Sequence, residues 1–173
     1  MVVLVLISLM TAMIVPEMRG TYGDALLRSQ SRELVNALNL AYSRSVSINQ
    51  PHRVRLDKIA GRYFIERRVR EAASGSSFAP ARDLPDGEGR INPRISIEVR
   101  KPGEMLSDPS SQSQPLDSRD NPASPEGDDA ITFYPDGTAD DREILLEDRD
   151  GFRLALQVNP ITARIHIVER ERK

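Results

Sequence analysis

The sequence has no cysteine, and this absence excludes disulfide bonds, thiolate metal sites and a cysteine nucleophile. Histidine is also scarce, because His52 and His166 are the only two in 173 residues. Two histidines leave little material for a zinc site or a histidine-based catalytic triad. The sequence also has no G-x-S-x-G nucleophile elbow. We therefore expect no enzymatic activity, no cofactor and no small-molecule substrate.

Neither sign of charge dominates, since 24 Lys and Arg face 26 Asp and Glu, which gives a net charge of -2. This balance does not suggest a nucleic-acid partner. The densest basic run consists of Arg62, Arg67, Arg68 and Arg70. Alternation along a strand would place Arg67 on the opposite face from Arg68 and Arg70, which dilutes the positive patch. We interpret the run as a charged strand face that prevents aggregation and expect no nucleic-acid partner.

The first stretch, Met1 to Val15, carries no charge, and Pro16 and Glu17 follow it. As a helix it would span roughly 22 Å, whereas a bilayer core is about 30 Å thick and needs about 20 residues. Three interpretations are open: a secretory signal core, a buried core helix, or a membrane helix whose first residues lie upstream. The stretch lacks a basic flank and a small-x-small cleavage site, and it is apolar all round. These features favour the membrane helix and predict a gene that continues upstream of Met1, which in-frame reading of the genomic DNA would check.

Residues 17–50 are predicted to continue this helix as an amphipathic segment. Apolar residues at i, i+3 and i+4 spacing share one face of it, namely Met18, Tyr22, Ala25, Leu26, Leu34, Val35, Leu38, Ala41, Tyr42 and Val46. Asn49-Gln50-Pro51 is expected to end the helix, because the residue before a proline disfavours helical geometry. The chain thus divides into a transmembrane segment over 1–16, the amphipathic continuation over 17–50, and a β domain over 51–173.

From His52 onward the apolar period changes from 3.6 to 2, which indicates strands. Strands are expected within 52–59, 63–69, 95–99, 131–134, 144–146, 152–158 and 165–168. Residues 72–93 are rich in Gly, Ser and Pro and are predicted to form a loop. Residues 101–129 have almost no large apolar side chains, which predicts a disordered insertion. The predicted fold class is α+β, with a long N-terminal helix packed on a small antiparallel sheet.

This plan resembles that of type IV pilins and type II secretion pseudopilins. Two passages resemble the GspH/FimT minor pseudopilins in particular. They are Leu34–Arg55, LVNALNLAYSRSVSINQPHRVR, and Ile131–Val168, ITFYPDGTADDREILLEDRDGFRLALQVNPITARIHIV, the second with an F-x-P-x-G turn. Members of the class begin their mature chain with an aromatic residue, a short apolar run and a Glu, whereas this sequence starts within the apolar run. The family often has a glycine in its last turn, where this chain has Ala163.

The resemblance implies a minor pseudopilin of a type II secretion system, a structural subunit that contributes to pseudopilus assembly and to protein export across the outer membrane. It implies a single-pass inner-membrane protein whose C-terminal domain lies in the periplasm. Its partners would be membrane lipid, through Met1–Val15, and other pilin-like subunits. Two alternatives are left open: a minor pilin of a type IV pilus, some of which bind DNA in uptake, and a membrane-anchored periplasmic module that binds a ligand or calcium.

One acidic cluster is a weak candidate for a metal site. Asp136, Asp140, Asp141 and Glu143 lie within eight residues of each other, and calcium prefers loops rich in oxygen ligands. Major pseudopilins bind calcium near their C-terminal end. The spacing matches no EF-hand, however, and we interpret these residues as solvated acids in turns, without a bound metal.

Overall fold

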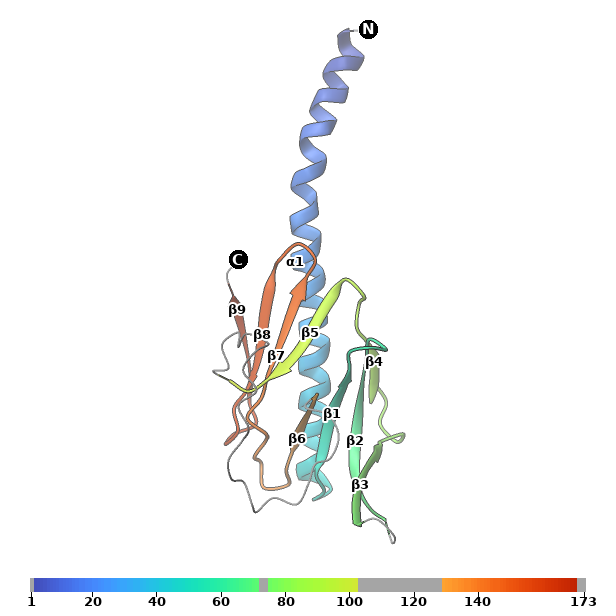
Figure 1. Cartoon of the computed structure of the whole chain (residues 1–173), viewed down its shortest axis with the longest axis vertical. Helices are drawn as coiled ribbons and strands as arrows, with labels where there is room; N and C mark the ends of the chain where they lie inside the picture. Colours follow the sequence, from blue (N-terminus) through green and yellow to red (C-terminus); the bar gives the residue numbers. More distant parts are fainter. Residues whose placement is uncertain (1, 72–74, 103–128, 171–173) are drawn as a thin grey trace, which may run out of the picture.

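The computed structural model describes residues 2–71, 75–102 and 129–170. A single helix, α1 (Val2–Ser47), runs through 46 residues. Its second half lies along the strands, and its first half extends beyond them (Figure 1). In the second half, Leu34 and Leu38 are buried against the strands, as the amphipathic pattern predicted. Leu27 is buried in place of its predicted neighbour Leu26, and Ala25 and Val46 of the predicted face are exposed. The described part of the chain holds no helix that is both long and apolar enough to cross a membrane.

The helix ends slightly earlier than expected, at Ser47 instead of Gln50. Asn49 adopts a left-handed conformation with a φ of 52°. The amide of Gln50 donates to the carbonyl of Ser45 at 3.2 Å. A left-handed residue followed by this bond is the Schellman arrangement, which satisfies carbonyl groups that the helix leaves unpaired. The helix therefore stops before Pro51 by its own capping geometry, and asparagine suits the site because it tolerates positive φ.

Five strands form the first sheet, in the order β3-β2-β1-β6 with β4 paired to β2. They are β1 (His52–Asp57), β2 (Arg62–Glu71), β3 (Gly75–Pro80), β4 (Glu88–Arg90) and β6 (Ala130–Phe133). The predicted hairpin of β1 and β2 is confirmed, with Val54 opposite Ile65 and Gly61 in a turn at φ 59°. Both side chains of this pair are buried toward the helix, so the alternate residues of each strand face outward.

Four strands form the second sheet, in the order β5-β7-β8-β9. They are β5 (Ile95–Arg100), β7 (Glu143–Asp148), β8 (Arg153–Val158) and β9 (Ile165–Arg170). All pairs in both sheets are antiparallel, which confirms the predicted fold class. The expectation of one sheet was too simple, because β6 pairs with β1 while the strands after it pair with β5. The two sheets meet along the second half of α1 (Figure 1).

The prediction that residues 72–93 form a loop was wrong, because β3 and β4 both lie in this range. Neither strand shows an alternating apolar pattern. Both are held by backbone hydrogen bonding to the same edge of β2, β4 beside its first residues and β3 beside its last. A polar segment can pair as a strand when a neighbouring strand has free backbone N–H and C=O groups along its edge. The periodicity of the segment's own side chains cannot reveal such a neighbour. Of the predicted insertion over 101–129, residues 103–128 lie outside the described residues.

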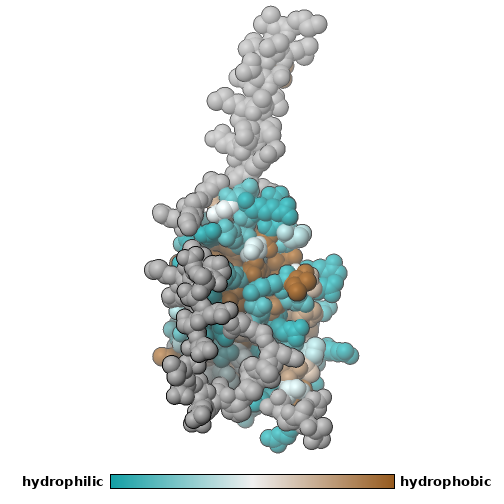
Figure 2. Space-filling view, viewed as in Figure 1, coloured by the Kyte–Doolittle hydropathy of each residue, from teal (hydrophilic) through white to brown (hydrophobic). Residues whose placement is uncertain are grey.

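The core lies between α1 and the inner faces of both sheets. Its fully buried large side chains include Leu34, Leu38, Val54, Ile65, Ile131, Phe133, Ile144, Leu146 and Leu156. The ring of Phe133 meets that of Tyr42 edge to face, with centroids 6.2 Å apart. Each such side chain contributes about 1.5–3 kcal/mol by leaving water. Away from the core, the side of the domain seen in Figure 2 is mostly hydrophilic, with hydrophobic residues visible near its middle.

Candidate interaction surfaces

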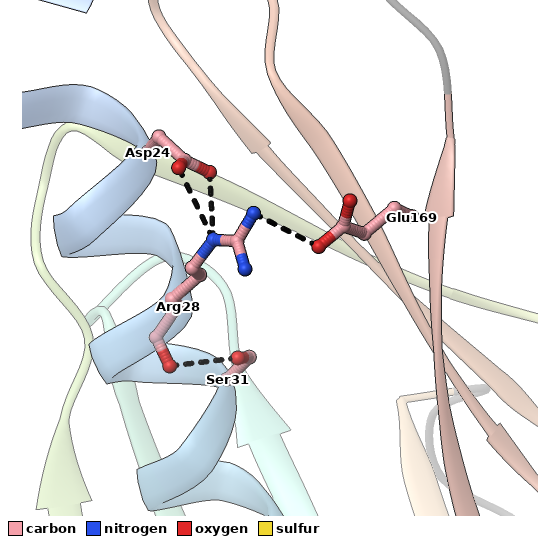
Figure 3. A network of polar contacts seen from close by, with 4 residues as sticks. All are labelled: Asp24, Arg28, Ser31 and Glu169. Carbon is pink, nitrogen blue, oxygen red and sulfur yellow. Dashed lines mark hydrogen bonds and ion pairs between the residues drawn. The ribbon is translucent and has the colours of Figure 1, made fainter. Parts of the chain in front are cut away.

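Arg28 ties the helix to the last strand (Figure 3). Its Nε lies 3.1 Å from both carboxylate oxygens of Asp24, one helical turn earlier, and its Nη2 lies 3.0 Å from Oε1 of Glu169 on β9. The hydrogen bond and charge of Asp24, and then the charge of Glu169, raise the pKa of Arg28. These groups are largely exposed, so the pairs add little to the stability of the fold.

A second set of polar contacts joins the helix to the first sheet. The hydroxyl of Tyr63 donates to Oε1 of Glu33 at 3.0 Å, and the amide of Asn92 donates to the side-chain oxygen of Gln30 at 2.8 Å. Burial, followed by the charge and hydrogen bond of Glu33, raises the pKa of Tyr63. Because Gln30 and Glu33 are neighbours on the helix, these bonds fix both its rotation and its height against the sheet.

The four acidic residues singled out from the sequence do not converge. Asp136 accepts hydrogen bonds from the amide and hydroxyl of Thr138, and Asp141 is exposed. Asp140 accepts from the amide of Thr132 at 2.9 Å and from the hydroxyl of Tyr134 at 3.0 Å. Burial, with help from Asp140, raises the pKa of Tyr134 to about 12. In the parts of the chain that the structure describes, no three His, Cys, Asp or Glu residues group as metal ligands would.

Glu143, the fourth of these acids, is 1 % exposed and lies on the outer side of the second sheet. Its carboxylate accepts from Nε of Arg100 at 3.2 Å and from Nη2 of Arg170 at 2.9 Å. A single carboxylate thus joins β5, β7 and β9. Its two oxygens are already engaged by guanidinium groups, which gives it a structural role in the sheet.

The last residue of β7 places a carboxyl group against the helix, which sequence reasoning did not foresee. Asp148 is 3 % exposed, and neither of its carboxylate oxygens has a hydrogen-bond partner among the described residues. One of these oxygens occupies the space where a Cβ at position 23 would lie, so Gly23 is needed for this approach. The sequence showed Asp148-Arg149-Asp150-Gly151 only as a turn, because nothing local reveals that the helix covers it.

The histidines occupy two different environments. His52 is 2 % exposed and its Nδ1 lies 2.9 Å from the carbonyl oxygen of Gln50, just beyond the end of the helix. His166 is exposed on β9, where it pairs with Gln157. The two belong to different sheets, and the expectation that the chain is not an enzyme stays a prediction.

Strand pairing gathers arginines on the outer face of the first sheet, which we call the basic face. It consists of Arg53 and Arg55 on β1, Arg62, Arg68 and Arg70 on β2, and Arg90 on β4, with Phe64 and Phe78 among them. The register settles this grouping, because Arg55 lies opposite Phe64 and Arg68 lies opposite Phe78. Arg67 does project to the other side, as alternation predicted, and reaches Asp83 at 3.7 Å. What the sequence could not show was that β1 and β4 add their arginines to those of β2.

The middle of the basic face is held by a buried ion pair. Nε of Arg53 donates to Oε2 of Glu66 at 2.6 Å, and Nη1 of Arg55 lies 3.6 Å from the other carboxylate oxygen. Arg53 also lies over the ring of Phe78, at 4.1 Å from its centroid. Such stacking is worth about 0.5–2 kcal/mol, more when water is excluded. This cluster keeps the centre of the face rigid, while Arg62, Arg70 and Arg90 are exposed around it.

A pocket of about 240 Å³ opens beside this cluster. It lies where β3 and β4 leave a gap along the edge of β2, and Phe64, Pro80, Leu84 and Glu88 are among its lining residues. Phe64, Pro80 and Glu88 belong to the outer side of the sheet, because each pairs in register with another outward residue. The pocket therefore opens within or at the border of the basic face.

Comparisons with known proteins identify the architecture. No family model matches the sequence, and no curated protein matches it. Among solved structures, the minor pseudopilin EpsH from the type II secretion system of Vibrio cholerae aligns with a TM-score of 0.57 at 10% identity, over 88% of this chain and 99% of that one. The chain has the pilin-like fold. The type IV minor pilin FimU of Pseudomonas aeruginosa PAO1 aligns with a TM-score of 0.50 at 18% identity, over 84% of this chain and 98% of that one.

Proposed function

We propose that this chain is a structural minor pseudopilin of a type II secretion system, which takes part in pseudopilus assembly and in protein export across the outer membrane. The observation that carries the proposal is the pilin-like fold together with a helix that extends well beyond the domain (Figure 1). Val3 and Ile7, in the extending half, are 65% and 56% exposed. A helix segment that is apolar all round is stable when lipid or other helices surround it.

The proposal assigns a place to each part of the chain. Residues 1–16 lie in the inner membrane before assembly and among other subunits' helices afterwards. Residues 17–50 continue the helix along the β domain, and residues 51–173 form the domain in the periplasm. The chain makes contacts with pilin-like subunits and membrane lipid and performs no catalysis. The similarity to FimU favours a second candidate, a minor pilin of a type IV pilus, since the two systems share this fold.

The absence of native cysteine allows a direct test, because a single introduced cysteine reports only its own contacts. Val3→Cys should cross-link, in the membranes of the native host, to cysteines placed in the apolar runs of pilin-like subunits from the same gene cluster. Ile161→Cys is the matched control, since Ile161 is 79% exposed but lies in the turn between β8 and β9. A protein that washes off membranes and gives no cross-link from position 3 would contradict the proposal.

Deletion of the gene distinguishes the two candidate systems. Loss of protein secretion with intact pili supports the pseudopilin, whereas loss of pili with intact secretion supports the minor pilin. Complementation with the full chain should restore the lost process in either case. If the chain restored secretion or pili only through an enzymatic activity of its own, a purely structural role would be contradicted.

A further inference from the structure

We propose that the basic face docks an acidic surface of a neighbouring subunit, with one apolar side chain of that neighbour seated in the pocket beside Phe64. This inference rests on the proposed role as a filament subunit and names one of its contact surfaces. Its basis is the juxtaposition of exposed arginines, two phenylalanines and a pocket on one side of the first sheet.

The charges at the rim of this face do not stabilise the sheet, unlike the buried pair of Arg53 and Glu66 at its centre. Arg62 lies directly opposite Arg90, and both side chains are exposed. Like charges directly opposite one another on paired strands are destabilising. On its other side Arg62 pairs in register with Asp57, whose Oδ1 already accepts hydrogen bonds from the amides of Ile59 and Ala60. An acidic partner would offset the repulsion between Arg62 and Arg90. Docking would thereby relieve a contact that destabilises the isolated sheet.

Within the face, the groups divide into a fixed centre and an exposed rim. Glu66 and Arg53 are 4% and 9% exposed and bonded to each other, so the centre is already neutralised and rigid. Arg62, Arg70 and Arg90 are exposed around it. A rigid centre with a charged rim resembles a protein interface, where arginine and aromatic residues are enriched and polar groups surround a buried anchor.

The size of the pocket fits a side chain better than a small molecule. Its volume of about 240 Å³ lies below the roughly 300–1,000 Å³ of typical ligand sites. An apolar cavity of about 150 Å³ is enough for benzene, so this pocket has room for one phenyl ring or one branched aliphatic group. Phe64 and Leu84 supply apolar walls, and Arg82 and Glu88 are the charged residues of its lining.

Protein fits this face better than nucleic acid or lipid. Asp57, Glu66 and Glu88 belong to the same side of the sheet, and the chain as a whole has a net charge of -2. An evenly charged phosphate backbone would meet these acids as well as the arginines, and phosphate contacts dominate nucleic-acid affinity. A protein surface can instead place its acids opposite the arginines alone. The first sheet also lies around the part of α1 farthest from Val2 (Figure 1), which places it away from a bilayer that holds the start of the helix.

The test uses the full chain in its native host, with a photo-reactive phenylalanine analogue replacing Phe64. Ultraviolet light should cross-link it to a pilin-like subunit encoded in the same gene cluster, and mass spectrometry should place the link in a peptide that contains Asp or Glu. Adding Arg62→Glu and Arg90→Glu should lower the yield by about tenfold or more, since like charges across an interface cost several kcal/mol. Arg164→Glu reverses the charge of an exposed residue in the turn between β8 and β9, outside the basic face, and should leave the yield unchanged.

A charge exchange completes the test. Replacing the two acids of the cross-linked peptide by Arg should restore the yield of the Arg62→Glu, Arg90→Glu chain and lower that of the original chain. Equal yields with and without the arginine reversals would overturn the proposal, as would a cross-link to nucleic acid or lipid or to a peptide without acids. If position 64 gives no link while Val3→Cys still cross-links, the docking surface is wrong and the filament role stands. If neither position links, both proposals fall.

Discussion

Removing the charge of Glu143 should destabilise the protein strongly, because this carboxylate is buried and holds two arginines. It is 1% exposed, whereas the side chains of Arg100 and Arg170 are 14% and 45% exposed. Breaking a buried ion pair by changing one partner costs about 3–5 kcal/mol, since the remaining charge stays in a poorly solvated site. Here Arg170 can turn to water, so we expect the low end of that range, about 3 kcal/mol, for Glu143→Gln.

The two arginines should differ, and this difference tests the reasoning. Arg100→Ala should cost about 2–3 kcal/mol, because its guanidinium is nearly as buried as the carboxylate. Arg170→Ala should cost about 1 kcal/mol or less, as exposed pairs do. For a chain of this size, each kcal/mol lowers Tm by about 2–4 °C. Urea and thermal unfolding of the full chain in mild detergent, followed by circular dichroism, gives these values.

Two results would refute this account of the cluster. One is an equal decrease in the free energy of unfolding for Arg170→Ala and for Arg100→Ala. That result would mean that the exposure of the arginine does not determine how much its removal destabilises the protein. The other is a loss under about 1 kcal/mol for Glu143→Gln, which would mean that the carboxylate is not acting as a buried anion. The double variant of Glu143 and Arg100 should cost less than the sum of the two single variants, because the two groups contact each other.

Four further results are expected. A chain that begins near Thr21 should be soluble and monomeric without detergent, as size-exclusion chromatography can show; aggregation would mean that the boundary is misplaced. Deleting residues 101–129 should change Tm little, because closure entropy varies by only about 0.6 kcal/mol per doubling of loop length; a sharp fall would show that the segment packs. Stability should fall as pH rises from about 10 to about 12, because the unfolded chain releases the Tyr134 proton at lower pH than the folded chain does. Tyr134→Phe should reduce that fall, and Tyr63 should supply the part that remains; an unchanged pH profile would contradict the assignment. Gly137→Ala should lower the free energy of unfolding, measured in urea, by about 1–2 kcal/mol, because φ is 88° there. The added Cβ itself has room, since its nearest neighbouring atom would be 3.9 Å away; a neutral effect would show that the turn adjusts.

Elements with a strong apolar period could be predicted from the sequence. The second half of α1, the hairpin of β1 and β2, and strands β5 to β8 bury apolar side chains on at least one face, which leaves a recognisable pattern in the sequence. β9 follows from Ile165 and Ile167, although most of this strand is exposed. Elements without such a face could not be predicted. β3 and β4 consist largely of small or polar residues, and they exist because β2 is long enough to pair with both along one edge.

Special backbone positions were partly visible. The F-x-P-x-G motif correctly indicates a turn, and Gly137 in that turn has a positive φ. Ala163, in the turn between β8 and β9, also has a positive φ, 51°, although it is not a glycine. Hydrogen bonds from the amides of Ile161 and Thr162 to the side chain of Asn159 help hold this turn. A left-handed alanine costs about 1–2 kcal/mol, which these bonds help to offset.

The sequence does not show which strands pair, and for this reason the positive charge of the basic face was underestimated. Alternation within β2 correctly separates Arg67 from Arg68 and Arg70, and along a single strand the positive charge does look diluted. The charge of a sheet surface, however, is the sum over strands whose pairing depends on the whole fold. Arg55 reaches the face because β1 pairs with β2, and Arg90 reaches it because β4 occupies the edge of β2 beside Arg62. A run of arginines on one strand therefore indicates little by itself. The register of its neighbours decides whether it is a dispersed solvated surface or the rim of a docking site.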